Sequence, residues 1–253
     1  AKKESSIIGC MQLLKEKKVE AVFSAGSTGA TLISAITILG KQKGVIRPAI
    51  ASVLPTINGS VILLDSGASL DVKPKVLYQF AVIGSKLAEV LLDIDAPRVG
   101  LLNNGEEESK GRDLEKSAYK LLSSSNLNFI GNVEGRDFAN EKVDVFVTDG
   151  FTGNVVLKTL EGTARLQQKL ISDSLNRNLL KPLLPIVKNA FKPVKDKLNP
   201  DKTNASYLLG VDGLVTIGHG SSKQEAIKNG IKYTSSSIQK DFIGKFSETL
   251  KEL

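Results

Sequence analysis

Short apolar runs alternate with longer helical stretches along this chain, and most of the apolar runs end in a turn rich in glycine and polar residues. The short runs, which we predict to be strands, are residues 19–23, 49–54, 61–64, 99–102, 128–130, 143–147 and 213–217. The predicted helices are residues 28–39, 75–92, a segment ending near 124, a segment from 155 onward and the whole chain after 222. This alternation indicates a mostly parallel sheet covered by helices on both faces.

The length and the single cysteine limit the kind of protein that this chain can be. The 253 residues fit one large domain or one and a half small ones. Cys10 has no partner for an internal disulfide, which fits a reducing cytoplasm. The polar start of the chain does not resemble a signal peptide, and no run approaches the roughly 18 apolar residues needed to cross a membrane. We therefore expect a soluble, cytoplasmic protein.

The net charge of +7 belongs almost entirely to one segment. Residues 165–202 contain nine Lys or Arg and three Asp, a balance of +6, so the rest of the chain is close to neutral. Proteins that bind single-stranded nucleic acid stack bases on aromatic rings, and Phe191 is the one aromatic residue between these lysines. The charge therefore does not predict a nucleic-acid partner.

Five polar, glycine-containing turns follow predicted strands, and in an open parallel sheet ligands bind at the carboxyl ends of the strands. Glycine lets a ligand approach the backbone, and a helix that begins after the turn offers free N–H groups and the positive end of its dipole. We expect the turns to share one edge of the sheet and to bind a phosphate-containing group. Residues predicted in these turns to contact phosphate or substrate are Ser24, Gly26, Ser27, Thr28, Gly29, Asp65, Gly67, Asn103, Gly105, Asp149, Gly150, Gly153 and His219.

The same turns have a plainer interpretation, which the sequence leaves open. Their glycines can serve the geometry of the strand-to-helix connection, and their polar residues can cap helices. His219, between two glycines, fits a local structural role as well as a ligand contact. From its spacing alone, Lys110 fits a solvated surface lysine as well as a residue that points toward the ligand edge.

The sequence lacks the residue patterns of nucleotide-binding, metal-binding and histidine-assisted catalytic sites. The turn GSTG does not have the G-x-G-x-x-G spacing of a dinucleotide site, and no P-loop is present, so we predict no nucleotide cofactor. The single histidine excludes a histidine-rich metal site and leaves little basis for Ser/His or Cys/His catalysis. The run Glu106–Glu108 could form an acidic cluster, but we expect it to supply carboxylates to a helix N-terminus, and we predict no metal.

Seven blocks in order make the chain resemble the bacterial phosphate acyltransferase family. The blocks are SAGSTGA, RPAIASVLPT, LLDSGASLDVKP, RVGLLNNGEEESKG, NFIGNVEGRD, DGFTGNVVLKTLEG and the final GHGSS. The resemblance covers nearly the whole chain. It implies transfer of a long-chain acyl group from acyl carrier protein to inorganic phosphate, which gives acyl phosphate for phospholipid synthesis.

The resemblance also implies a fold and partners. The expected fold is a three-layer α/β/α sandwich with a mostly parallel sheet, related to phosphotransacetylases and isopropylmalate dehydrogenases. The expected assembly is a homodimer that associates peripherally with the membrane. Members of the family begin with a further segment that contains a block like DAMGGD, so we interpret residues 1–253 as one acyltransferase domain that is incomplete at its N-terminus.

Two residues take catalytic roles through the resemblance. The lysine of EEESKG is Lys110 and the asparagine of DGFTGN is Asn154. We expect Lys110 to neutralise phosphate or the developing oxyanion, and Asn154 to donate a hydrogen bond to one of them. Within the matching blocks we also assign Arg47 and Glu107 to phosphate or substrate binding.

The basic segment predicts an amphipathic helical hairpin over residues 170–200, inserted in the domain. Pro182 and Pro185 predict a corner between two short helices. A basic amphipathic hairpin can lie in an anionic membrane surface, and packing against the body or a second subunit fits the pattern equally. The residues predicted to face the membrane or the acyl chain are Leu179, Leu183, Val187, Phe191 and Val194.

Three rival functions remain open. A phosphotransacetylase-like enzyme for short-chain acyl-CoA would share the fold but would not need the hairpin. A non-catalytic scaffold for carrier protein or membrane would not need Lys110 and Asn154. A nicotinamide-dependent dehydrogenase is the weakest rival, because its glycine fingerprint is absent.

Overall fold

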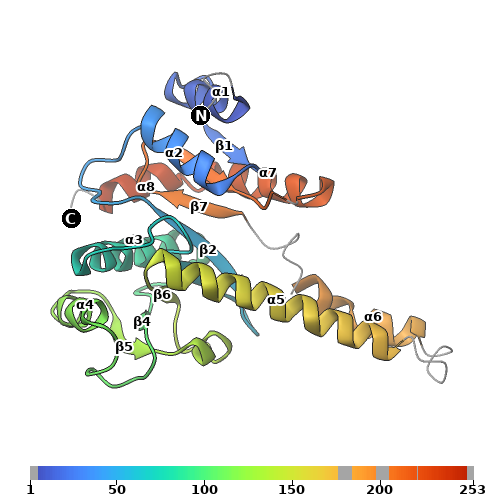
Figure 1. The fold of residues 1–253 in the computed structure, drawn as a ribbon. Helices are drawn as coiled ribbons and strands as arrows, with labels where there is room; N and C mark the ends of the chain where they lie inside the picture. The colour runs from blue at the N-terminus through green and yellow to red at the C-terminus, as the bar shows by residue number, and fades with distance from the viewer. Residues whose placement is uncertain (1–4, 176–183, 198–204, 221, 250–253) are drawn as a thin grey trace.

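The computed structural model describes residues 5–175, 184–197, 205–220 and 222–249 (Figure 1). Eight strands form one sheet in the order β1-β8-β7-β2-β3-β6-β4-β5. The strands are β1 (Ala21–Ser24), β2 (Ala49–Pro55), β3 (Ser60–Leu64), β4 (Val99–Leu102), β5 (Phe129–Val133), β6 (Val145–Val147), β7 (Ser206–Leu209) and β8 (Leu214–Ile217). The helices are α1 (Ser6–Lys15), α2 (Thr28–Ile38), α3 (Pro74–Leu92), α4 (Asp113–Ser123), η1 (Gly135–Ala139), α5 (Gly150–Leu175), α6 (Leu184–Lys197), α7 (Gln224–Gln239) and α8 (Phe242–Thr249).

Helices cover both faces of the sheet, so the fold is a three-layer α/β/α sandwich as expected. One large apolar cluster packs α3, α4 and α8 against one face. On the other face the core is divided in two. Helices α1 and α2 pack on the part that contains β1 and β8, whereas η1 and the start of α5 pack on the part that contains β3, β4 and β6. The gap between these two smaller cores is where a cavity can form.

The strands do not all point the same way, and this corrects the expectation of one shared edge. Four of the seven strand pairings are parallel. The three antiparallel pairings are those of β2 with both of its neighbours, β7 and β3, and that of β7 with β8. The tight turn at Asn58-Gly59 sends β3 back along β2, and β4, β5 and β6 follow the direction of β3. The carboxyl ends of β1 and β8 therefore face those of β3, β4 and β6 from the opposite direction.

The register shows where the two sets of strand ends meet. Ser24 and Ile217, the last residues of β1 and β8, lie level with Ser206, the first residue of β7. Leu64, at the end of β3, pairs with Ala51 in the middle of β2. The turns that follow the strands thus converge on the middle of β2 from both sides.

Several helix limits differ from the predicted ones. Helix α5 begins at Gly150, five residues before the predicted start, because its first turn is made of the glycines and small polar residues that we assigned to a turn. The C-terminal stretch is two helices, since Asp241 adopts a left-handed conformation between them. The run Glu106–Glu108 precedes α4, whose first turn instead contains Asp113 and Glu115. Helix α1 and strand β7 were not predicted.

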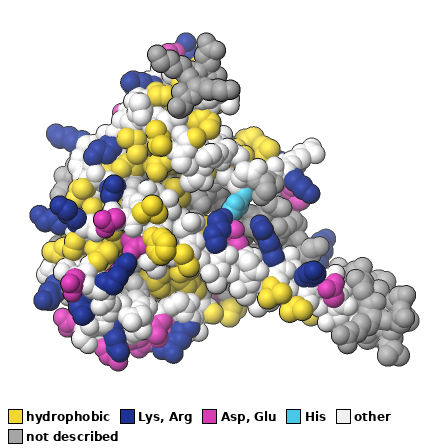
Figure 2. All heavy atoms as spheres, viewed as in Figure 1, with side chains coloured by type: hydrophobic (Ala, Val, Ile, Leu, Met, Phe, Trp, Pro, Cys, Tyr) yellow, Lys and Arg dark blue, Asp and Glu magenta, His cyan; other side chains and the backbone are white. Residues whose placement is uncertain are grey.

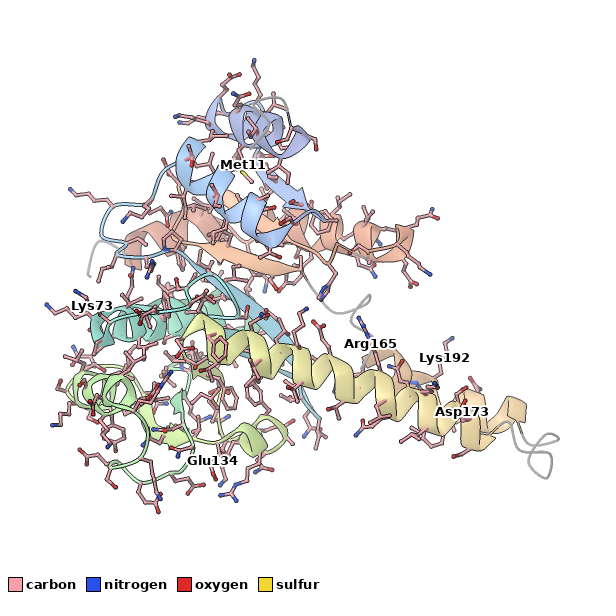
Figure 3. All side chains as sticks on the ribbon, viewed as in Figure 1. Met11, Lys73, Glu134, Arg165, Asp173 and Lys192 are labelled. Carbon is pink, nitrogen blue, oxygen red and sulfur yellow. The ribbon has the colours of Figure 1, made fainter. Side chains whose placement is uncertain are left out.

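Helices α5 and α6 extend from the body as an arm (Figure 1). Arg165 and Asp173 on α5 and Lys192 on α6 lie along it (Figure 3). Among the described residues, no helix has both the length and the apolar character needed to cross a bilayer.

Candidate active site

A cavity of about 710 Å³ lies between the two smaller cores, with the middle of β2 as its floor. Its apolar lining includes Ile50, Val53, Leu54, Ile57, Phe138, Leu157, Leu160 and Val194. Its polar lining includes Thr28, Ser52, Ser66, Gly67, Asn154, Lys158, Glu161, Ser206 and His219. An apolar cavity with a few converging polar groups is the usual form of a small-molecule site. Of the predicted phosphate-contacting and catalytic residues, the cavity brings together Thr28, Gly67, Asn154 and His219.

Asn154 and Gly67 lie next to each other on the lining of this cavity. Asn154 lies in the first turns of α5, and a β-carbon added to Gly67 would lie 3.7 Å from the Asn154 side chain. Gly67 has a φ of +142°, a conformation that favours glycine. Asn154 thus lines the cavity beside a glycine that is favoured by its backbone conformation and not by close packing.

Asp65 organises the turn that carries Gly67. Its carboxylate is fully buried and accepts hydrogen bonds from the backbone N–H groups of Ile50, Gly67, Ala68 and Ser69 at 2.8–3.1 Å. Burial raises the pKa of Asp65 above its usual value, and these four N–H donors oppose that rise. Because its oxygens are occupied by backbone donors, the geometry supports the plainer interpretation, in which Asp65 shapes the turn.

The glycines at the start of α5 allow the helix to pack directly on this turn. A β-carbon at Gly153 would lie 1.9 Å from the Asp65 carbonyl oxygen, and one at Gly150 would lie 2.6 Å from the carbonyl oxygen of Ser69. No larger side chain fits at either position without displacing backbone. Gly150 and Gly153 therefore determine where Asn154 stands.

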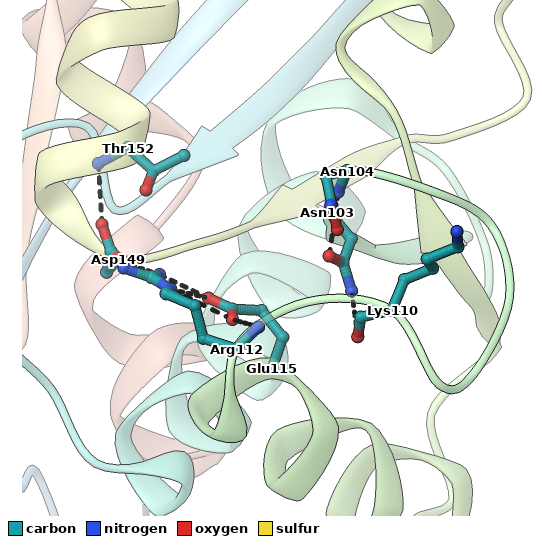
Figure 4. Close-up of polar contacts among 7 residues, drawn as sticks. All are labelled: Asn103, Asn104, Lys110, Arg112, Glu115, Asp149 and Thr152. Carbon is teal, nitrogen blue, oxygen red and sulfur yellow. Dashed lines mark hydrogen bonds and ion pairs between the residues drawn. The ribbon is translucent and has the colours of Figure 1, made fainter.

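Arg112, which the sequence alone did not single out, ties the starts of α4 and α5 together (Figure 4). Arg112 donates to the carboxylates of Glu115 and Asp149, and these hydrogen bonds raise its pKa further. Asp149 also accepts from the N–H of Thr152 at 2.7 Å. Asp149, 2% exposed, is thus a helix-capping residue held by a cation. Arg112 directly follows the EEESKG block, and this position is the sequence feature that could have singled it out.

Lys110 lies on the loop between β4 and α4, outside the residues that line the cavity. Its ammonium is 4.0 Å from the Glu107 carboxylate, and its side chain is 46% exposed. Asn103 donates to the Lys110 carbonyl oxygen at 3.2 Å and so shapes this loop. A β-carbon at Gly105 would lie 2.9 Å from the Lys110 side chain. Figure 4 shows the ammonium pointing away from Arg112 and Asp149.

The turn after β1 contributes one cavity residue, Thr28 at the start of α2. Ser27 caps α2 by accepting from the N–H of Ala30, and Ser24 is buried beside the hydroxyl of Thr31 at 2.9 Å. Gly26 packs near Ile7, whereas a β-carbon at Gly29 would meet open space. Ser27 therefore serves the capping role that the sequence left open, and Ser24 forms a local side-chain hydrogen bond.

His219 belongs to a polar cluster on the cavity wall, and its two other members, Glu161 and Lys158, were not predicted. Its Nε2 lies 2.9 Å from Glu161, and the Lys158 ammonium lies 3.1 Å from the same carboxylate. Burial alone would raise the pKa of Glu161, but the hydrogen bonds from His219 and Lys158 outweigh it, and the pKa falls below its usual value. Figure 2 shows the histidine, in cyan, where the arm leaves the body. Spacing gave a weak signal, since Asn154 and Glu161 are seven residues apart on one helix.

Arg47 is exposed and lies away from the cavity. Its guanidinium donates to the Asp71 carbonyl oxygen at 2.7 Å, and the buried Gln79 side chain accepts from its backbone N–H. These contacts fix the loop before β2.

The predicted membrane-facing or acyl-facing residues divide into described and undescribed positions. Leu179 and Leu183 lie outside the described residues, and α6 includes Val187 in its backbone. Phe191 and Val194 are 41% and 47% exposed, and Val194 also lines the cavity. Within the described ranges, no group of three or more His, Cys, Asp or Glu residues is placed to hold a metal ion.

Comparison with known proteins identifies sequence relatives over the whole chain. The family model described as fatty acid synthesis protein matches residues 1–245. A phosphate acyltransferase of Thermoanaerobacterium thermosaccharolyticum is 44% identical over 96% of this chain and 73% of its own length. A phosphate acyltransferase of Halothermothrix orenii is 43% identical over 99% of this chain and 76% of its own length. The chain thus spans about three quarters of these relatives.

Solved structures with the same fold are more distant in sequence. A phosphotransacetylase from Streptococcus pyogenes matches with a TM-score of 0.57 at 17% identity, covering 92% of this chain and 67% of that one. A branched-chain phosphotransacylase from Enterococcus faecalis V583 matches with a TM-score of 0.59 at 12% identity, covering 90% and 78%. At these identities the likeness supports the α/β/α fold.

Proposed function

This chain belongs to the fatty acid synthesis protein family, and from that premise we propose that it is a phosphate acyltransferase. The reaction converts a long-chain acyl-[acyl carrier protein] and inorganic phosphate into acyl phosphate and free carrier protein. The observation that carries the proposal is the cavity, whose lining combines apolar side chains suited to an acyl chain with Gly67, Asn154, Thr28 and His219. No cofactor enters the proposed reaction.

The proposed reaction needs little general-base catalysis. Phosphate is an anion at neutral pH, so the site has to hold it free of water and aim one oxygen at the thioester carbonyl carbon. As the new C–O bond forms, the carbonyl oxygen becomes an oxyanion, and the C–S bond then breaks. A carrier thiolate has a pKa near that of cysteine, about 8.5, so it leaves and takes up a proton without a strong acid. The demanding task is stabilisation of the oxyanion.

In this proposal Asn154 donates a hydrogen bond to phosphate or to the oxyanion. Its place opposite Gly67 in the cavity wall supports the role. Lys110 neutralises the same charge. Its exposed ammonium lies on the loop that follows β4, and the role requires its flexible side chain to leave Glu107 and turn toward the ligand. Thr28, Gly67 and His219 bind phosphate or the acyl thioester.

The further parts of the proposal concern partners and location. We place residues 1–253 in one acyltransferase domain and residues 170–200 in an amphipathic hairpin inserted within it. The exposed side chain of Phe191 supports contact of this hairpin with an anionic membrane surface, so the protein would be cytoplasmic and peripherally bound to membrane. Acyl carrier protein and a second copy of the chain are the proposed protein partners.

One assay tests the function and its nearest rival together. Palmitoyl-carrier protein or acetyl-CoA is mixed with phosphate and the protein, and acyl phosphate is trapped with hydroxylamine. We expect product with palmitoyl-carrier protein that depends on phosphate and on the protein. Turnover of acetyl-CoA alone would favour a phosphotransacetylase, and turnover of neither substrate would favour a non-catalytic scaffold.

A further inference from the structure

Three serines form a continuous chain of hydroxyl groups on the cavity floor. The Ser66 hydroxyl lies 2.8 Å from that of Ser52, which lies 2.9 Å from that of Ser206. Ser52 and Ser66 are each 4% exposed, and all three residues line the cavity. The chain of hydroxyls crosses the sheet where its two sets of strands meet, and it separates the two smaller apolar cores.

The number of hydroxyl protons fixes which serine donates and which accepts in this chain of hydroxyl groups. The Ser66 hydroxyl donates to the Ile50 carbonyl oxygen at 3.0 Å, and a carbonyl oxygen can only accept. Each serine has a single hydroxyl proton, so Ser52 donates to Ser66, and Ser206 donates to Ser52. The proton of Ser206 is then committed, and its oxygen can only accept a hydrogen bond from a ligand.

Ser206 lines the cavity together with Gly67, Asn154 and His219. Ser66 precedes Gly67, which faces Asn154. Ser206 pairs with Ile217, two residues before His219. An anion bound in this cavity is therefore offered the Ser206 oxygen as a hydrogen-bond acceptor.

From this geometry we propose that Ser206 is a specificity-determining residue that accepts the P–OH hydrogen of the bound phosphate. The proposal rests on the function proposed above and deepens it. At neutral pH phosphate carries at least one P–OH group, so it can donate to Ser206 while its charged oxygens accept from Asn154 and other donors.

The consequence is discrimination against anions of the same shape that carry no proton. Sulfate at neutral pH has only acceptor oxygens, and one of them would face the lone pairs of Ser206. Sulfate could bind well only if the hydroxyl chain reversed, which would break the hydrogen bond from Ser66 to Ile50. Arsenate carries an As–OH group, so the site should accept it as it accepts phosphate.

The test compares phosphate with sulfate in Ser206→Ala, Ser206→Thr and a control, Ser236→Ala, which removes an exposed hydroxyl on α7. The KM for phosphate and the inhibition constant of sulfate are measured in the acyl phosphate assay, and binding of both anions is measured by calorimetry. In Ser206→Ala, loss of one hydrogen bond to a charged ligand should reduce the preference for phosphate over sulfate by about tenfold. Ser206→Thr, which keeps the hydroxyl, and Ser236→Ala should retain the wild-type preference.

The outcomes separate the two proposals. If wild type makes no acyl phosphate but binds phosphate more tightly than sulfate in a Ser206-dependent way, the proposed function fails and the proposed acceptor stands. If wild type is active and folded Ser206→Ala keeps the wild-type preference, the acceptor role is wrong. Ser52→Ala is a second test. It interrupts the series of hydrogen-bonded hydroxyl groups beside Ser206, so it should also reduce the preference for phosphate over sulfate.

Discussion

At the scale of single residues, Glu161 shows how one carboxylate can hold a site together. It accepts from His219, which follows β8, and from Lys158 on its own helix, so it links the two sides of the cavity. Its side chain is 13% exposed, and a partly buried ion pair is less screened by solvent than an exposed one. The lowered pKa of Glu161 means that the folded state favours its charged form.

We expect Glu161→Gln to lower the free energy of unfolding by about 1 kcal/mol at neutral pH, since a neutral amide is a weaker acceptor for the Lys158 ammonium and the His219 N–H. A depressed carboxyl pKa contributes stability above the unfolded-state value, which is about 4.3 for Glu, and this stability disappears as the pH falls through the lower folded-state value. Urea unfolding at pH 7 and in steps below pH 4.5 measures the free energy of unfolding of wild type and of Glu161→Gln. A difference between them that stays constant as the carboxylate is protonated would contradict this account.

The two catalytic assignments make a separate prediction. Asn154→Ala and Lys110→Ala should each lose most of the turnover, about 10²-fold or more, because each removes a donor to developing negative charge. Both variants should unfold close to wild type, since both side chains are exposed. The acyl phosphate assay and thermal unfolding measure the two effects. Near-normal turnover in either variant would remove that residue from the mechanism, and Lys116→Ala, on the exposed surface of α4, is the control.

At the scale of elements, the start of α5 depends on contacts from three other segments. Its first turn packs on the loop after β3 through Gly150 and Gly153, and Asp149 caps it while held by Arg112 from the start of α4. The helix then extends beyond the body and leads toward α6. One rigid element thus connects Asn154 in the cavity with the arm.

The arm gives a prediction about membrane binding. Phe191→Ser should reduce flotation of the protein with anionic liposomes, because it removes an exposed aromatic ring from a basic amphipathic helix. Ile46→Ser changes an apolar side chain that is also exposed, at 53%, but lies on the body, and it should float as wild type does. Equal flotation of Phe191→Ser and wild type would favour the alternative, in which the arm packs against protein.

At the scale of the whole molecule, the two sets of strands meet at β2 and build the cavity between them.

Exposed apolar side chains also gather beside the start of α5. Leu70 is 73% exposed and Phe151 is 60% exposed, and their neighbours Ser69 and Gly150 are joined by a backbone hydrogen bond of 2.7 Å. Apolar side chains exposed together often mark a protein interface.

We expect the protein to be a homodimer, and light scattering after size-exclusion chromatography should give the mass of two chains. We expect Leu70 and Phe151 to lie in the dimer interface. The double variant Leu70→Glu with Phe151→Glu should therefore shift the mass to that of one chain, because it places like charges in this interface. Ile33→Glu, at a position 63% exposed on α2, is the matched control and should remain a dimer. A wild-type mass of one chain would rule out a stable dimer at that concentration.

The sequence by itself predicted much of the secondary structure, because strands and helices follow from the local spacing of apolar residues. Strand β4 has the predicted limits, and α2 ends within one residue of them. Helix α1 was missed because only Met11 and Leu14 are buried in a stretch surrounded by lysines. The start of α5 was missed because Gly150 and Gly153 usually disfavour a helix and are accepted here only for close packing.

The order of the glycine-rich blocks was enough to identify the family and the reaction class, and the family model and the relatives confirm both. The tertiary structure alone decided that the turns meet from two directions across β2, that the Asp65 and Asp149 carboxylates accept from backbone N–H groups, that Arg112 pairs with Asp149, and that Glu161 and the three serines line the cavity. These contacts join residues far apart in the chain. Their partners are set by the reversal at β2 and by side-chain packing, which no local spacing of residues records.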